Sequence, residues 1–195
     1  VYGIYISYSD NTVVDNNTVT DNNAIHYAYN IFGNYTNGAT YTNNHMVTNA
    51  ASTSRWASSY NLYLNRSTDL TVENNYAEIY GPSPTSGSTY NYYFYATDRS
   101  TINANEANMG ASSGNTHYGF YYGLPSGTST NPLVVSNNMV YQTAVSTNRY
   151  YGMYFWSNAS YLELIHNAVN LTLGNTQARA FYSTMNGANS SIRNN

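Results

Sequence analysis

The chain has 195 residues, 32 of them asparagine and 24 tyrosine, with no cysteine and no lysine. Six arginines and nine acidic residues give a net charge of −3, which predicts no basic face and argues against nucleic acid as a partner. The lack of cysteine excludes disulfides and thiol chemistry. No apolar run approaches the roughly eighteen residues of a membrane-spanning helix, so membrane insertion is not expected.

A repeat of 27 to 33 residues runs through the whole chain. Each repeat opens with an apolar strand, led by tyrosine in six of the seven, and reaches an asparagine-containing bend about fifteen residues later. In chain order the repeats begin at Tyr2, Tyr29, Tyr60, Tyr90, Tyr118, Tyr151 and Arg179. A fixed period in this range predicts a solenoid, here one domain over residues 1–195.

The opening residue of each repeat is position 1 of the first predicted strand. Because side chains alternate along a strand, positions 1, 3 and 5 are predicted to point inward and positions 2 and 4 outward. Position 4 is aromatic in every repeat: Tyr5, Phe32, Tyr63, Tyr93, Tyr121, Tyr154 and Tyr182. If this column is bare, it forms an apolar stripe on which sugars can stack; alternatively, the rings only stack on one another.

A second predicted strand supplies another inward column and ends at the asparagine bend. The column is Val14, Tyr41, Val72, Ile102, Val135, Leu164 and Ile192. The second residue of the bend is always asparagine: Asn17, Asn44, Asn75, Asn105, Asn138, Asn167 and Asn195. Asparagine tolerates the left-handed backbone of a tight bend, and stacked amides can hydrogen-bond along the column. The sequence therefore predicts an asparagine ladder.

A third short strand follows two residues after the bend. Its inward column is Val19, Met46, Ala77, Ala107, Val140 and Val169. Three strands per repeat, stacked in parallel, predict an all-β, right-handed parallel β-helix of about seven rungs. Terminal repeats of solenoids normally carry polar caps, and none is visible here, so we expect an uncapped part of a longer chain.

Few residues have the spacing that catalysis needs. The best cluster comprises Arg66, Asp69, Asp98 and Arg99, and its members Asp69 and Arg99 occupy the same place on adjacent rungs. This cluster is either a surface ion pair or an acid/base site. None of the histidines shows a metal-ligand spacing, so no metal or cofactor is expected. We expect structural roles for them, with His166 replacing the first asparagine of its bend: His26, His45, His117 and His166.

The recurring pattern YGIY…VxNN resembles the parallel β-helix repeats of the pectate-lyase-like superfamily and of periplasmic copper-site accessory proteins. The tyrosine- and asparagine-rich, lysine-free composition is similar to that of long secreted surface proteins of gliding bacteria. This resemblance covers the whole chain. It implies a secreted location at a bacterial cell surface, and it implies little about function because this fold hosts many activities.

Three functions agree with the sequence. The first is a non-catalytic structural or adhesive segment whose partners are glycans or other surface proteins, bound through the aromatic column. The second is a polysaccharide lyase or glycoside hydrolase, for which the acids lack the paired spacing of a hydrolase site. The third is a secreted cargo bound to a secretion machine.

Overall fold

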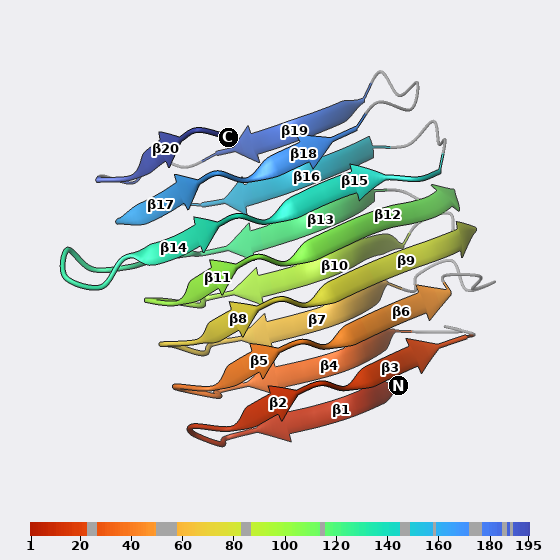
Figure 1. Ribbon diagram of the computed structural model, residues 1–195, viewed down its shortest axis with the longest axis horizontal. Helices are drawn as coiled ribbons and strands as arrows, with labels where there is room; N and C mark the ends of the chain where they lie inside the picture. Colours follow the sequence, from red (N-terminus) through yellow and green to blue (C-terminus); the bar gives the residue numbers. More distant parts are fainter. Residues whose placement is uncertain are drawn as a thin grey trace.

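The computed structural model describes residues 1–22, 27–49, 58–82, 87–113, 116–144, 149–157, 159–171, 177–184, 187 and 189–195. His26 lies outside these residues. Within them the chain forms strands and no helix, and the strands pair in parallel in three sheets. Figure 1 shows the strands of each sheet stacked in chain order, with the N- and C-termini at opposite ends of the stack. The predicted all-β parallel solenoid is confirmed; its right-handed sense stays a prediction.

The first sheet contains the opening strand of each repeat. Its members are β1 (Tyr2–Ser7), β4 (Ala28–Asn34), β7 (Ser59–Asn65), β10 (Ser88–Tyr95), β13 (Thr116–Gly123), β16 (Arg149–Trp156) and β19 (Ala178–Ser183). Tyrosine, phenylalanine and β-branched residues fill these strands, as the pleated surface favours. The first sheet lies behind the other two in Figure 1.

The second and third sheets complete each turn. The second sheet is β2 (Val13–Asp15), β5 (Thr40–Thr42), β8 (Thr71–Glu73), β11 (Thr101–Asn103), β14 (Leu133–Ser136), β17 (Leu162–Ile165) and β20 (Ser191–Arg193). The third sheet is β3 (Thr18–Asp21), β6 (His45–Asn49), β9 (Tyr76–Pro82), β12 (Glu106–Ser113), β15 (Met139–Gln142) and β18 (Ala168–Asn170). The predicted columns are in register, with Val72 paired with Ile102 and Ala77 with Ala107.

The core runs along the axis between the sheets. Positions 3 and 5 of the first sheet point into it, as Leu62 and Leu64 do. The inward columns of the second and third sheets are also buried, apart from members near the ends: Val19 and Val169 are partly buried, and Ile192 on β20 is exposed. Seven of the largest fully buried side chains are aromatic: Tyr41, Tyr92, Phe94, Phe120, Tyr122, Tyr150 and Phe155. Aromatic stacking inside the solenoid therefore provides much of its apolar contact.

The prediction for positions 1 and 2 was wrong. On β7, two consecutive side chains, Asn61 and Leu62, are both buried, while Tyr60 before them is only partly buried. The pairing of β4 with β7 joins Tyr29 to Tyr60 and Ile31 to Leu62 and passes over position 2. The strand bends at position 2, so the alternation resets there, as at a bulge. Position 1 consequently faces outward and position 2 inward.

The asparagine bend also differs from the prediction in one detail. The left-handed residue is the first of the pair, with φ between 52° and 55° in every repeat: Asn16, Asn43, Asn74, Ala104, Asn137, His166 and Asn194. The second residue is not left-handed, and its side chain is free to point inward. The bend role expected for His166 is confirmed by its φ of 54°.

Candidate binding face on the first sheet

Two aromatic columns cover the outer face of the first sheet. One is formed by position 1: Tyr2, Tyr29, Tyr60, Tyr90, Tyr118 and Tyr151. The other is the predicted position-4 column: Tyr5, Phe32, Tyr63, Tyr93, Tyr121, Tyr154 and Tyr182. We call the two columns together the tyrosine face. Sequence reasoning found the second column and placed the first column in the core.

Rings within each column are stacked, and the two columns meet edge to face. Tyr60 and Tyr90 have centroids 4.7 Å apart and ring planes inclined by 3°, and Tyr63 and Tyr93 are 4.6 Å apart at 6°. Across the columns, Tyr60 and Tyr63 are 5.2 Å apart at 86°. Both arrangements are the favoured geometries of aromatic pairs. The spacing follows from the distance of about 4.8 Å between neighbouring strands.

This stacking changes what the face offers to a ligand. A flat, bare stripe was one expectation, but each inner ring has a neighbouring ring on both of its faces, so solvent meets mainly ring edges and hydroxyl groups. The inner rings are partly buried, as at Tyr63 and Tyr93. Tyr5 on β1 is 57% exposed. Along the face a ligand would therefore meet ring edges and phenolic hydroxyls, and the end ring Tyr5 on β1 offers it an open side.

The hydroxyls of the tyrosine face are held in their neutral form. Burial raises the pKa of Tyr29 to about 12, with smaller contributions from neighbouring tyrosines. Burial likewise raises the pKa of Tyr60, Tyr93 and Tyr118. At neutral pH each of these groups can donate and accept hydrogen bonds.

The asparagine ladder forms as predicted. The backbone N–H and the Nδ2 of Asn44 both donate to Oδ1 of Asn75, each at 2.9 Å, and Nδ2 of Asn44 also donates to the carbonyl oxygen of Val14. The pattern continues through the remaining ladder residues to Asn195. Each amide thus satisfies backbone groups that the bend removes from the sheets, which is what buried polar groups require.

A second, shorter ladder lies at position 2 and was not predicted. Nδ2 of Asn30 donates to Oδ1 of Asn61, and Nδ2 of Asn61 to Oδ1 of Asn91, both at 2.8 Å. All three side chains are buried. Asparagine in three successive repeats at one position was a visible signal, but the assumed outward direction of position 2 hid it.

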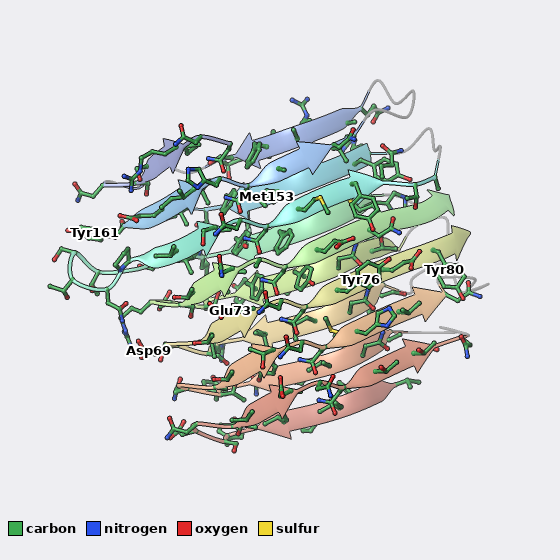
Figure 2. All side chains as sticks on the ribbon, viewed as in Figure 1. Asp69, Glu73, Tyr76, Tyr80, Met153 and Tyr161 are labelled. Atoms are coloured by element: carbon green, nitrogen blue, oxygen red, sulfur yellow. The ribbon has the colours of Figure 1, made fainter. Side chains whose placement is uncertain are left out.

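The predicted acidic cluster contains a paired aspartate. Arg99 donates through Nε and a terminal nitrogen to the two carboxylate oxygens of Asp69, at 3.0 and 2.7 Å, and this bond lowers the pKa of Asp69. Asn131 also donates to Asp69, at 3.2 Å. Asp98 is partly buried, and burial raises its pKa. Asp69 lies at the corner before β8 in Figure 2. An exposed ion pair such as Asp69 with Arg99 contributes about 0–1 kcal/mol to stability.

A polar cluster on the outer face of the third sheet was missed. Tyr76 donates to Glu78 at 3.0 Å, and Asn108 donates to Glu78 at 3.1 Å. Tyr141 donates to Glu106 at 2.6 Å, and burial together with this bond raises the pKa of Tyr141. Figure 2 shows Tyr76 on β9, away from the corner that holds Asp69. The residues come from three repeats, so no local sequence motif predicted the cluster.

The described residues contain no group of three or more histidine, aspartate or glutamate side chains placed to hold a metal ion. Over the same part of the chain, no helix has the length and apolar character needed to cross a membrane.

The fold and this face define a parallel β-solenoid with an aromatic outer surface. Scans against protein-family models, curated proteins and solved structures gave no match. The similarity to pectate-lyase-like proteins therefore stays a prediction, and the function has to be argued from the face itself.

Proposed function

We propose that this chain is a rigid, non-catalytic segment of a secreted bacterial surface protein and that its tyrosine face binds carbohydrate. The observation that supports the proposal is the continuity of the two aromatic columns over successive strands of one sheet. Exposed aromatic surfaces of this extent commonly mark interaction sites.

The chemistry of the face suits a polymer with many hydroxyl groups. The columns repeat at the strand spacing of about 4.8 Å, so the phenolic hydroxyls form a periodic array along the solenoid. The pKa values raised by burial keep hydroxyls such as those of Tyr60 and Tyr93 neutral. Neutral donors and acceptors beside apolar ring edges match the mixed polar and apolar surface of an extended glycan.

The test removes hydroxyls and keeps the rings. The double variant Tyr63→Phe/Tyr93→Phe preserves the stacking, since Phe32 already occupies the same column. Binding of the wild type and variants to a panel of immobilised polysaccharides would be measured by surface plasmon resonance. We expect at least about a fivefold loss of affinity, since each lost hydrogen bond contributes about 0.5–1.5 kcal/mol.

The matched control is Tyr122→Phe, which removes a fully buried hydroxyl inside the solenoid. It should leave carbohydrate affinity unchanged. Absence of binding by the wild type would refute the proposal and leave the chain as a stalk. Equal binding by the double variant would refute the role of the tyrosine face and place the binding site elsewhere.

One observation favours a second candidate, a polysaccharide-cleaving enzyme. The pKa of Asp69 is lowered by Arg99, whereas that of Asp98 is raised by burial. Neighbouring carboxyl groups with pKa values moved in opposite directions are typical of acid and base pairs. Release of reducing ends or of unsaturated products by the wild type, lost in Asp98→Asn, would support this function. If neither product is released from the same polysaccharide panel, the enzyme function is refuted.

A further inference from the structure

The arginines of this chain are few, and two of them meet in one pocket. Arg149 precedes the outward Tyr151 on β16, and Arg179 takes position 1 on β19, where the other repeats carry tyrosine. Together with Gln177 and Tyr182 these residues line a cavity of about 450 Å³ on the outer side of the first sheet. The cavity thus adjoins the tyrosine face where the position-1 column ends.

The other described arginines already have partners. Arg99 pairs with Asp69, Arg193 pairs with Glu163, and Arg66 donates to the hydroxyl of Tyr35 at 2.6 Å. Among the residues that the structure describes, Arg149 and Arg179 form no ion pair with a carboxylate. In a protein of net charge −3, two such guanidinium groups in one cavity make a local positive site.

Neighbouring side chains orient both guanidinium groups. Arg149 donates from Nε to Oε1 of Gln177 at 3.2 Å, a bond that does not use its two terminal nitrogens. Cζ of Arg179 lies 5.3 Å from the ring centroid of Tyr182, within the range of a cation–π contact. Guanidinium groups held in this way are suited to bidentate hydrogen bonding with a carboxylate or sulfate.

We infer that this pocket binds an oxyanion, a carboxylate or sulfate group carried by a sugar. The inference rests on the proposed function, since it names the chemistry of a ligand that lies along the tyrosine face. The neutral hydroxyls of that face contact the polymer, and Arg149 with Arg179 adds selectivity for an acidic residue at one end. Because both arginines are exposed, their contribution to the affinity for the ligand weakens as salt screens the charges.

The pocket can be tested with monosaccharides, which are too small to need the tyrosine face. The probes are glucuronate, glucose 6-sulfate and neutral glucose, titrated into the full chain while the arginine Nε–Hε signals are followed by NMR. We expect saturable shifts of Arg149 and Arg179 with at least one anionic sugar and none with glucose. The two anionic probes distinguish a carboxylate from a sulfate site.

Variants separate the pocket from general charge effects. Arg149→Gln and Arg179→Gln should each weaken binding about tenfold, the typical effect of one charge-assisted contact. Arg193→Gln removes the same charge on β20 and should have no effect. No shift with either anion, or an equal loss in Arg193→Gln, would overturn the inference.

The outcome for the proposed function is read independently. Saturable binding of an anionic monosaccharide without any polysaccharide binding would keep the pocket and reject the carbohydrate-binding face. Polysaccharide binding that weakens in Tyr63→Phe/Tyr93→Phe, with no response of the arginines to either anion, would support the carbohydrate-binding face and reject the pocket.

Discussion

A Cβ atom placed on Gly119 would lie 2.6 Å from Cγ1 of Val140, closer than real Cβ contacts allow. Gly152 and Val169 are related in the same way one repeat later. Repeats with asparagine at position 2 carry Met46, Ala77 or Ala107 at the equivalent place on the third sheet. The same site is thus filled in two ways. Either glycine stands at position 2 and valine on the third sheet, or asparagine stands at position 2 and methionine or alanine on the third sheet.

This relationship predicts that Gly119→Ala is strongly destabilising and that Val140→Ala relieves part of the cost. The added methyl group overpacks the site, which typically costs about 1–3 kcal/mol. The relief is partial because the Cβ would also lie 2.6 Å from the carbonyl oxygen of Gly152. A double-mutant cycle by urea unfolding measures the coupling, expected to be about 1 kcal/mol or more. Simple additivity of the two substitutions would contradict the packing argument.

The asparagine ladder should be more important for stability than the bend residue beside it. Asn75→Ala leaves the N–H and Nδ2 of Asn44 without their acceptor and removes the bond from Nδ2 of Asn75 to the carbonyl oxygen of Tyr41. Each buried group left unsatisfied costs about 1–3 kcal/mol, so we expect a loss of about 3–5 kcal/mol in the free energy of unfolding.

The control for this prediction is Asn74→Ala, at the exposed, left-handed position of the same bend. It should cost about 1 kcal/mol, the penalty of a left-handed alanine. Chemical denaturation of both variants decides between them, and an equal loss would mean that the ladder bonds contribute no more than the bend.

Ala104 is a position at which the protein can be stabilised. Its φ is 52°, whereas asparagine occupies this place in most repeats. Ala104→Asn should raise the free energy of unfolding by about 0.5–1.5 kcal/mol, because asparagine tolerates the left-handed region better than alanine. Its amide can also reach the previous rung, as Nδ2 of Asn137 does toward Oδ1 of Asn103 at 2.8 Å. A fall in the thermal unfolding temperature would show this account to be mistaken.

Two buried tyrosines should respond in opposite ways to loss of the hydroxyl. The hydroxyl of Tyr122 is buried and has no hydrogen-bond partner among the residues that the structure describes, whereas that of Tyr92 donates to the carbonyl oxygens of Asn75 and Glu106 at 2.8 and 3.0 Å. Tyr122→Phe should stabilise by about 1–3 kcal/mol, and Tyr92→Phe should destabilise by about 0.5–1.5 kcal/mol. Calorimetry of the pair tests the assignment, and the same sign for both variants would be evidence against it.

His117 should make stability sensitive to acid. Burial lowers its pKa from 6.5 to about 4, while Nδ1 lies 2.8 Å from Oγ1 of Thr89. Between these pH values the unfolded chain binds a proton that the folded protein excludes. The free energy of unfolding therefore keeps the full contribution of the buried neutral His117 above pH 6.5. It falls by up to about 3 kcal/mol as the pH is lowered toward 4.

The measurement is the pH dependence of unfolding between pH 6.5 and 4. His117→Gln should show a flatter slope than the wild type, because the buried titrating group is gone. The control is His166→Asn, which removes an exposed histidine at a bend position that asparagine occupies in most other repeats; a change of slope shared by both variants would not be due to the burial of His117. A wild-type slope in His117→Gln would assign the acid sensitivity to other groups.

The sequence alone determined the class of fold, the inward columns of the second and third sheets, the asparagine ladder and the pairing of Asp69 with Arg99. Each of these depends on the repeat length, because stacking places equivalent residues one strand apart. Six or seven copies of each position made the repeat recognisable despite insertions of a few residues.

Tertiary structure decided which way the first strand turns its side chains. Alternation is a local rule that holds along an unbroken pleat, and the bend at position 2 depends on how all three sheets close around the core. That bend turns Tyr60 outward and Asn61 inward, creating both the second column of the tyrosine face and the buried ladder of Asn30, Asn61 and Asn91. Closure of the same turns brings Arg149 and Arg179 into one cavity.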